Sequence, residues 1–352
     1  DHSWLNNYAL TLALHNAAVE AAYIKTDYAA MQPLTEQVLA RAHCLLDQVR
    51  VYEISIQAQV ARNQFDGAVA TALEVLGLLG VSLPLSPSPL RSWAGLVRTQ
   101  WLLKRSPAEQ ILAAESMQDP QYLAAMSILV SMFGAIKFSS SALRPLVTAK
   151  QVELCLRHGL TAVAAQAFAG YGGVLCGQYN AIDQGYALGR LALQLDQNSE
   201  SRQTHHRTLS LFNTYIRHWK EPLNASAESL LQGYQLALDS GDLEWGAYCL
   251  AAHIQFAFLQ AERLPELQPR FDQHIHWLRH SGQKQSIQYS LFTLQVIDNL
   301  RNSRPHPTWL DGKYYQEDFM LAEHRRENHK TAICLHHFYK ALLSYLFGEF
   351  EA

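Results

Sequence analysis

The sequence predicts an all-α protein, an irregular tetratricopeptide-like superhelix of helix pairs, or α-solenoid. Of its 352 residues, 49% are hydrophobic and only 17% are charged, which excludes general disorder. Ala and Leu dominate the hydrophobic share, and they recur at i, i+3 and i+4 rather than in alternation. The ends of the first helices recur about every 40 residues, the period of helix-pair repeats. These observations together predict about eight stacked pairs, with a HEAT-like stack as the alternative geometry.

The clearest pair runs from Val49 to Pro84. Apolar residues in its first half lie on helical stripes, and the sequence Asn-Gln-Phe-Asp at 63–66 then interrupts the period. Asp66 is a candidate N-cap for the second helix, and Gly80 is a candidate C-terminal stop. Such a pair cannot bury its apolar faces alone, so we expect neighbours of the same kind on both sides.

The remaining helices are predicted from the same three signals: the period of apolar residues, N-capping residues and helix-breaking residues. Asp119-Pro120 is a strong helix start, and Gly159 is expected to end a helix. We predict helices at Tyr8–Lys25, Tyr28–Leu46, Arg91–Lys104, Pro107–Glu115, Gln121–Phe138, Ala142–His158, Thr161–Cys176, Ile182–Leu195, Ser201–Lys220, Pro222–Ser240, Leu243–Gln260, Pro265–His280, Gln283–Asn302 and Asn328–Phe347, with a looser partner after Pro305 and Pro307.

These elements suggest three parts. Residues 1–81 hold the N-terminal helix pairs, 82–120 a Pro/Ser-rich link with short helices, and 121–352 further pairs of the same superhelix with a truncated C-terminal unit. The chain begins without Met and ends at what resembles the start of another turn. We therefore expect an excised segment of a longer protein.

Composition also limits the partners. A formal charge of −3 and a pI near 6.6 give no electrostatic reason to expect binding to nucleic acid or an anionic membrane. No apolar run reaches the ~18 residues of a membrane span, and no signal peptide is visible. The five cysteines are widely spaced and odd in number, which favours a reduced, cytoplasmic setting without disulfides.

Catalytic and metal motifs are not recognisable, so we expect no catalytic, metal or cofactor-binding residues. The 16 histidines include adjacent pairs, which point about 100° apart on a helix and cannot chelate as i, i+4 pairs do. Ser139–Ser141 is interpreted as a turn, and Gly170-x-Gly172-Gly173 as close helix packing. The basic group Arg325-Arg326 with Lys330 is interpreted as a solvated helix face.

The densest aromatic and basic stretch is 212–221. Phe212, Ile216 and Trp219 are expected to share a core-facing side of one helix, while Arg217 and Lys220 face a groove or partner. Packing is the more frequent role of such residues, so the binding role is a hypothesis. The candidates for ligand or partner binding on the inner face are Arg217, His218, Lys220, Tyr248, His253 and Tyr289.

Several segments resemble the helical-repeat region of large bacterial signalling proteins. The resemblance rests on Leu10–His15, Val51–Ala58, Ala72–Val81, Ile216–Lys220, Ser240–Glu244 and Leu346–Phe350. In that family a serine/threonine kinase-like domain precedes an AAA/STAND-type ATPase, and the helical region is followed by a GAF domain and often a histidine kinase. The family's Walker motifs and phosphoacceptor histidine have no counterpart in these segments.

The resemblance implies a non-catalytic sensor or scaffold segment of a multidomain kinase that binds ATP in its other domains. The expected partners are the neighbouring ATPase, kinase and GAF domains and a small-molecule or protein effector. One alternative is a tetratricopeptide-type adaptor for peptides or proteins. Another is the sensor domain of a STAND-type transcription activator, an analogy of fold alone. An all-α enzyme remains a third alternative, for which a charged pocket with a perturbed His or Glu would be required.

Overall fold

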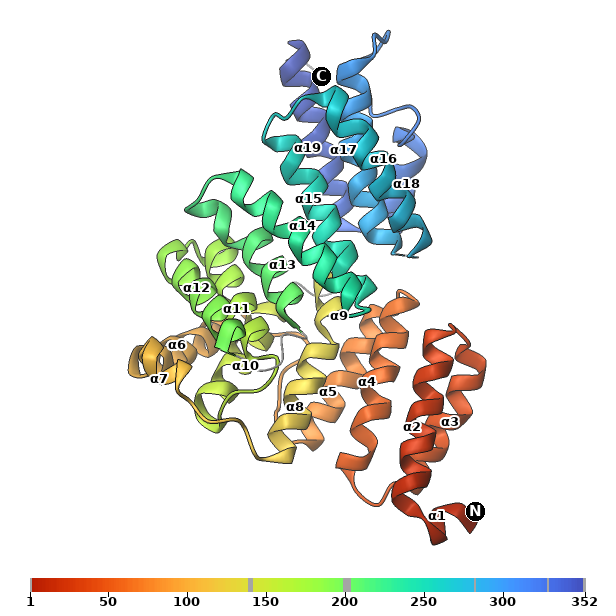
Figure 1. Ribbon diagram of the computed structural model, residues 1–352, viewed down its shortest axis with the longest axis vertical. Coiled ribbons are helices and arrows are strands. Elements are labelled where there is room, and N and C mark those ends of the chain that lie inside the picture. Colours follow the sequence, from red (N-terminus) through yellow and green to blue (C-terminus); the bar gives the residue numbers. More distant parts are fainter. Residues whose placement is uncertain (1, 139–141, 199–203, 282, 328, 351–352) are drawn as a thin grey trace. The chain divides into compact units, whose positions relative to one another are not determined.

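A computed structural model describes residues 2–138, 142–198, 204–281, 283–327 and 329–350. These residues form 19 α-helices and a short 3-10 helix (Figure 1). No β-strand occurs among them, and the two isolated bridges pair Ser116 with Leu160 and Asp311 with Gln316. The prediction of an all-α fold built from helix pairs is therefore confirmed.

Residues 1–174 form one compact unit, and residues 175–352 form a second. In the first unit the helices are α1 (His2–Asn6), α2 (Tyr8–Ile24), α3 (Tyr28–Arg41), α4 (Leu45–Ala61), α5 (Phe65–Leu78), α6 (Pro89–Arg105), α7 (Ala108–Leu112), α8 (Pro120–Ser131), α9 (Phe133–Phe138), α10 (Arg144–His158) and the start of α11 (Ala164–Tyr179). In the second unit they are α12 (Ile182–Asn198), α13 (His205–Tyr215), η2 (Arg217–Trp219), α14 (Leu223–Asp239), α15 (Leu243–Leu259), α16 (Leu264–His280), α17 (Lys284–Arg301), α18 (Glu317–Arg326) and α19 (Lys330–Phe347).

Each unit is stacked from antiparallel pairs whose first helices pack on one another. In the first unit α2 contacts α3 and α4, and α4 contacts α5 and α8. In the second, α13, α15, α17 and α19 form a continuous layer of first helices, with α14 and α16 packed beside it. This arrangement buries the apolar stripe of each helix against the next pair, as the repeat reasoning requires.

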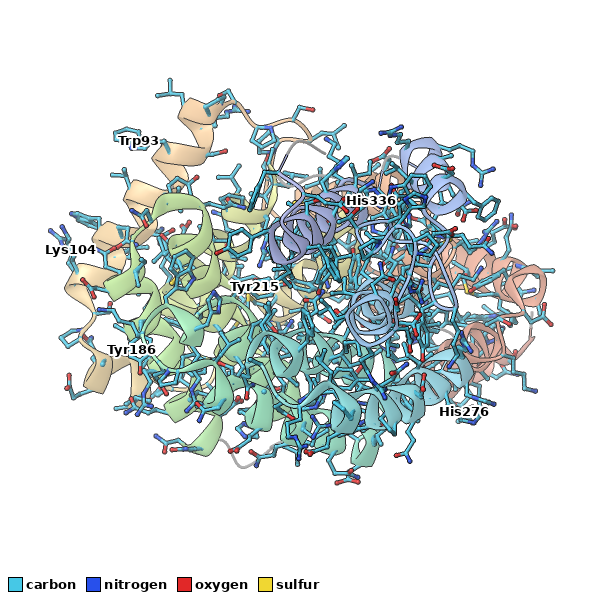
Figure 2. The ribbon with its side chains drawn as sticks, turned by 90° about the horizontal axis from the view of Figure 1, so that it is seen from above. Trp93, Lys104, Tyr186, Tyr215, His276 and His336 are labelled. Atoms are coloured by element: carbon cyan, nitrogen blue, oxygen red, sulfur yellow. The ribbon has the colours of Figure 1, made fainter. Side chains whose placement is uncertain are left out.

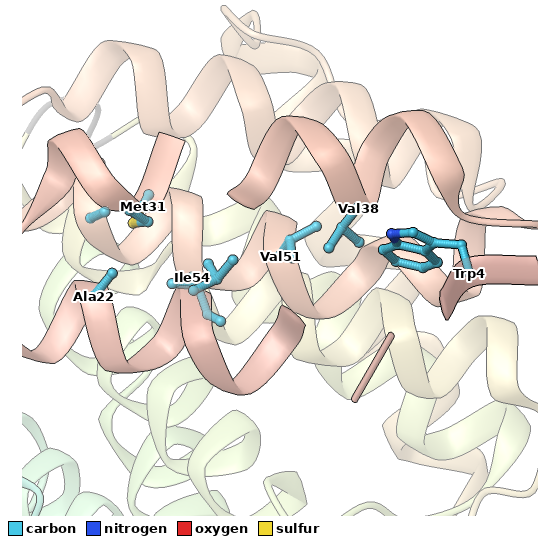
Figure 3. Close-up of a cluster of buried hydrophobic side chains, with 8 residues drawn as sticks. Trp4, Ala22, Met31, Val38, Val51 and Ile54 are labelled. Carbon is cyan, nitrogen blue, oxygen red and sulfur yellow. The ribbon is translucent and has the colours of Figure 1, made fainter. Parts of the chain in front are cut away.

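The N-terminal cluster shows how the pairs hold together. Val38 of α3 and Val51 and Ile54 of α4 are almost completely buried, and Trp4 and Met31 close the cluster (Figure 3). Burying a side chain of this size stabilises the fold by about 1.5–3 kcal/mol. Helical spacing places each of these residues on the buried stripe of its own helix, and the stacking of the helices brings the stripes together.

A recurrent turn joins the two helices of a pair. Thr26, Asn63, Asn180 and Ala261 each have a positive φ, between 52° and 58°, immediately after the first helix ends. Only Gly adopts this left-handed conformation without a steric cost. Because the position is filled by Thr, Asn or Ala, the repeat of the turn is not visible from glycine spacing.

The main predicted starts and stops are correct. Asp119 accepts a hydrogen bond from the Gln121 amide at 2.8 Å and caps α8. Gly80 has a φ of 76°, and Gly159 has a φ of 100°. At Gly159 an added Cβ atom would lie 2.6 Å from the Glu115 carbonyl oxygen, so this chain crossing requires glycine.

Two predicted boundaries in the first unit are wrong. Asp66 does not cap its helix, because α5 already begins at Phe65 and Asp66 lies in its first turn. The predicted helix Tyr28–Leu46 ends at Arg41, and α4 starts at Leu45. The hydroxyl of Tyr8 accepts from the His43 amide at 2.8 Å and donates to Asp47 at 2.6 Å, which holds the link between α3 and α4 extended.

Two predicted long helices are interrupted. The helix expected at Gln121–Phe138 divides at Met132 into α8 and α9, next to Ser131, whose hydroxyl donates to the Ile128 carbonyl at 2.9 Å. The helix expected at Ser201–Lys220 ends at Tyr215. The predicted starts at Ser201 and Asn328, and the predicted turn at Ser139–Ser141, lie outside the described residues.

Helix α6 departs from the expected pattern of one apolar face. Leu96 and Thr99 are buried against α10, whereas Trp93, Val97 and Trp101 are 46–59% exposed on the opposite side. Trp93 and Lys104 point away from the body of the first unit (Figure 2). None of the described helices combines the length and apolar character that a membrane crossing requires.

Candidate functional site

The layer of first helices in the second unit carries one tyrosine from each of three successive pairs. Tyr215 is the last residue of α13, and Tyr248 and Tyr289 lie in the first halves of α15 and α17. The three helices pack against one another in this order, and the Tyr215 phenol is a minor cause of the raised pKa values of Tyr248 and Tyr289, so the three hydroxyls lie within electrostatic range of one another. We refer to these three residues as the tyrosine row. Tyr248 and Tyr289 are two of the sequence candidates.

Tyr248 is held by its own helix. Its hydroxyl donates to Glu244 Oε1 at 2.7 Å, one helical turn earlier. Burial, followed by the negative charge of Glu244, raises the pKa of Tyr248 well above its usual value. The side chain nevertheless keeps part of its surface exposed. Tyr248 is therefore a neutral, hydrogen-bonded phenol that is partly exposed.

Tyr289 is more deeply placed, with 9% of its surface exposed. Its hydroxyl shares a hydrogen bond of 2.9 Å with Nε2 of His329, which precedes α19. Burial is also the main cause that raises the pKa of Tyr289. The tyrosine row is thus connected at one end to the next first helix, α19.

Arg217 and Lys220 do not lie on a helix face, which corrects the sequence prediction. They belong to the turn after α13, because the helix ends at Tyr215 and continues only as η2. Arg217 donates to Glu221 at 2.7 Å and to the Ala225 carbonyl at 2.8 Å, and Lys220 forms an ion pair with Asp183 of α12. Both side chains stabilise the turn between α13 and α14.

The early end of α13 also changes the aromatic residues of this stretch. Phe212 and Ile216 are buried as expected, but Trp219 is 44% exposed and its indole N–H donates to the Tyr215 carbonyl. The ring of His218 meets the ring of Phe256 edge-on at 5.9 Å. Burial lowers the pKa of His218.

His253 faces the second helices rather than the tyrosine row. It is 5% exposed, and its Nδ1 lies 2.9 Å from the Ala227 carbonyl of α14. Its ring packs edge-on against His274 of α16. Burial, His253 and Arg270 lower the pKa of His274 to about 4, so this pair is neutral and apolar in character at neutral pH. The geometry assigns His253 to interhelix packing.

A groove at the last helix pair contains a second histidine with a strongly lowered pKa, His336. It has a volume of about 510 Å³ and is lined from α18 and α19, including Glu317, His336 and Lys340. His336 lies 3.3 Å from the Tyr315 hydroxyl and 4.0 Å from Glu317, and burial lowers its pKa to about 4. Glu317 is itself ion-paired with Lys340 and accepts from the Leu310 amide at 2.8 Å. These contacts give Glu317 a structural role in holding the loop before α18.

The chemistry that these groups offer is recognition. Neutral phenols with raised pKa values donate and accept hydrogen bonds, and their rings present rigid apolar surface with few rotatable bonds. Among the described residues, no group of three or more His, Cys, Asp or Glu side chains could hold a metal ion. All five cysteines are described and unpaired.

Sequence reasoning missed two features of this kind. Tyr215 was not among the candidates, because the stretch 212–221 was interpreted as one helix. A cationic cluster in the first unit, described below, joins Arg98 of α6 to Glu153 of α10, which lie 55 residues apart in sequence. Periodicity places each of these residues on a helix but carries no signal that the two helices meet.

Comparison with protein-family models and with curated proteins found no match to this chain.

Proposed function

We propose that this chain is a non-catalytic sensor or scaffold segment of a multidomain bacterial signal-transduction kinase that also carries an ATPase module. The observation that carries the proposal is the tyrosine row, in which the first helices of three successive pairs, packed against one another in turn, each contribute one tyrosine. A ligand or partner domain that binds there contacts several repeats at once. The bacterial kinase context rests on the sequence resemblance alone.

Binding at the tyrosine row offers a physical route to coupling. Helix pairs in a repeat array contact mainly their neighbours, so the angle between pairs is a soft degree of freedom. A partner that bridges α13, α15 and α17 favours one set of angles over others. The difference in its affinity for the two arrangements is then the free energy available to bias neighbouring ATPase and output domains.

The first test concerns the coding sequence around this segment. The proposal predicts kinase and Walker motifs on the N-terminal side and a GAF domain on the C-terminal side. An open reading frame without any of these would remove the kinase context and favour the adaptor alternative.

The second test concerns the tyrosine row itself. Titration calorimetry of the 352-residue chain with the separately produced ATPase, kinase and GAF domains measures whether any of them binds. Tyr248→Ala is expected to weaken binding roughly tenfold or more, the usual effect of removing a buried aromatic anchor. Tyr345→Ala, an exposed tyrosine at the end of α19, is the matched control and leaves the affinity unchanged. Binding that responds equally to both variants would contradict the proposed surface.

A further inference from the structure

The first unit contains a cavity that the sequence did not indicate. It has a volume of about 330 Å³ and lies between α6, α10 and the segment 82–84 that precedes α6. The three elements are fixed relative to one another because α6 packs along α10, and Thr99 donates to its own helix and to the Ala149 carbonyl of α10. The cavity is therefore a feature of the packed fold and not of a loop.

Positive charge gathers around this cavity. Arg91, Arg98 and Lys150 line it, and Glu153 is the single acidic residue in its lining. Glu153 is 5% exposed. Its carboxylate forms ion pairs with three cations, Arg98, Lys150 (3.0 Å) and Arg157 (3.3 Å). The side chain of Arg91 has no ion-pair partner among the described residues. Three cations thus share the Glu153 carboxylate, and the cavity lining itself carries three cations and one carboxylate, an excess of two positive charges.

The proton affinities of the cluster reflect this excess. Burial and the neighbouring guanidinium groups of Arg98 and Arg157 lower the pKa of Lys150, and burial and Arg157 lower the pKa of Arg98. Like charges held together in a partly desolvated place are costly. An anion in the cavity removes that cost, which supplies a driving force for binding beyond the individual hydrogen bonds.

The remaining lining is apolar. Leu83, Pro84 and Leu146 form walls beside the charged groups, and Leu146 packs so closely on Gly95 of α6 that an added Cβ atom would lie 2.6 Å from Leu146 Cδ2. Its volume lies at the lower end of small-molecule sites. We propose that this cavity binds a small phosphoryl dianion, a phosphate monoester whose apolar body rests on Leu83, Pro84 and Leu146. A dianion neutralises twice the charge of a carboxylate and accepts from several cations at once.

This inference is independent of the proposed function. The cavity belongs to the first unit and the tyrosine row to the second, and their tests use different ligands and variants. Either can fail while the other stands.

The test is titration calorimetry of the 352-residue chain with inorganic phosphate, phenyl phosphate and benzoate. Phenyl phosphate is expected to bind most tightly, inorganic phosphate less tightly and benzoate weakest. Arg91→Gln is expected to weaken phenyl phosphate binding roughly fivefold to tenfold, because it removes one charged contact. Lys104→Gln makes the same change of charge on an exposed position of α6 outside the cavity, and is expected to leave the affinity unchanged.

A second variant is expected to change the affinity for phenyl phosphate in the opposite direction. Glu153→Gln removes the competing carboxylate, so it is expected to tighten phenyl phosphate binding roughly threefold to tenfold. Circular dichroism of each variant checks that the fold is intact. No binding of any phosphate compound, or equal losses in Arg91→Gln and Lys104→Gln, would overturn the proposal.

The phosphoryl group could belong to a soluble ester or to a lipid. Co-sedimentation with phosphatidylcholine vesicles, with and without phosphatidate, separates the two. Sedimentation that requires phosphatidate and is lost in Arg91→Gln supports the site with a lipid ligand. Phenyl phosphate binding without sedimentation supports it with a soluble one.

Discussion

The α6–α10 region of the first unit and the α17–α19 region of the second treat titratable groups in opposite ways. Around α6 and α10, Arg98, Lys150 and Glu153 stay charged beside a cavity that water can enter. Between α17 and α19, His336, Tyr315 and Tyr339 are nearly inaccessible and stay neutral, with their pKa values displaced by burial. The comparison shows that several ion pairs accompany the buried Glu153 carboxylate in the first region, whereas in the second region burial dominates and lowers the pKa of His336.

In the α17–α19 region, called the closed region below, side-chain amides make several of the buried hydrogen bonds. Gln295 accepts from the amides of Tyr314 (2.9 Å) and Tyr315 (3.2 Å) and donates to Asn299 at 2.8 Å. Asn299 in turn donates to the carbonyls of Pro307 and Trp309. These bonds, together with the ion pair between Arg304 and Asp298, attach the irregular segment before α18 to α17.

The largest expected effect is a loss of stability that differs between the two regions because their leucines are packed differently. Leu343 of α19 is fully buried in the closed region, whereas Leu146 of α10 lies on the cavity wall. Leu343→Ala is expected to cost about 3–4 kcal/mol, because it leaves a void among packed neighbours. Leu146→Ala is expected to cost about half as much, since part of its surface already faces open space.

Hydrogen exchange resolved by peptide measures this pair of variants, because it reports the free energy of opening in each unit separately. Equal losses of protection around α19 and α10 would show that the cavity is closed in solution.

The second effect is a dependence on pH that belongs to the closed region. Burial lowers the pKa of His336 from 6.5 to about 4. The unfolded chain therefore binds a proton that the folded chain does not, and the stability falls as pH decreases from about 6.5 to about 4. At about 1.4 kcal/mol per tenfold change in proton affinity, the loss is about 3 kcal/mol.

Urea unfolding at pH 7.0, 5.5 and 4.5 measures this loss of unfolding free energy. In His336→Gln the difference between pH 7.0 and 4.5 is expected to shrink by that amount. His276→Gln, on the exposed side of α16, is the control and keeps the full pH dependence. A pH profile identical in His336→Gln and the unmodified chain would contradict a neutral, buried His336.

The third effect tests the charged region. Glu153→Gln leaves Arg98, Lys150 and Arg157 without their common carboxylate. A loss of about 1–3 kcal/mol is expected at low ionic strength, because removal of one partner leaves charges unpaired. Thermal unfolding in 20 mM and 500 mM sodium chloride is the measurement, and salt is expected to recover part of the loss by screening. A loss unchanged by salt would indicate a packing defect instead.

The smallest effect concerns a feature that both units share. Thr26 and Ala261 occupy the left-handed turn position, each with a φ of 57°. Thr26→Gly and Ala261→Gly are expected to stabilise their units by about 0.5–1 kcal/mol, because Gly avoids the Cβ clash at positive φ. Hydrogen exchange around α2–α3 and α15–α16 measures the gains, and a loss at either site would show that its side chain makes a compensating contact.

Much of the fold follows from local sequence. Asp119 with Pro120, and Gly159, mark their boundaries because capping and positive φ depend on a few neighbouring residues. The end of α13 at Tyr215 does not follow, because Arg217 is drawn into bonds with Glu221 and Ala225 that only the folded turn provides. Of the candidate site residues, Tyr248 and Tyr289 could be identified from the sequence, because the period of apolar residues places both on the first helices of their pairs.

The sequence by itself determined that this protein is built of helices in pairs, where most of them begin and end, and that they stack as repeats. These properties depend on short-range backbone preferences and on the period of apolar residues. The tertiary structure alone decided that Trp93, Val97 and Trp101 remain exposed. It also decided that the tyrosine row forms and that cations from α6 and α10 enclose a cavity. Such outcomes depend on which helices meet, and no local pattern encodes a contact between residues tens of positions apart.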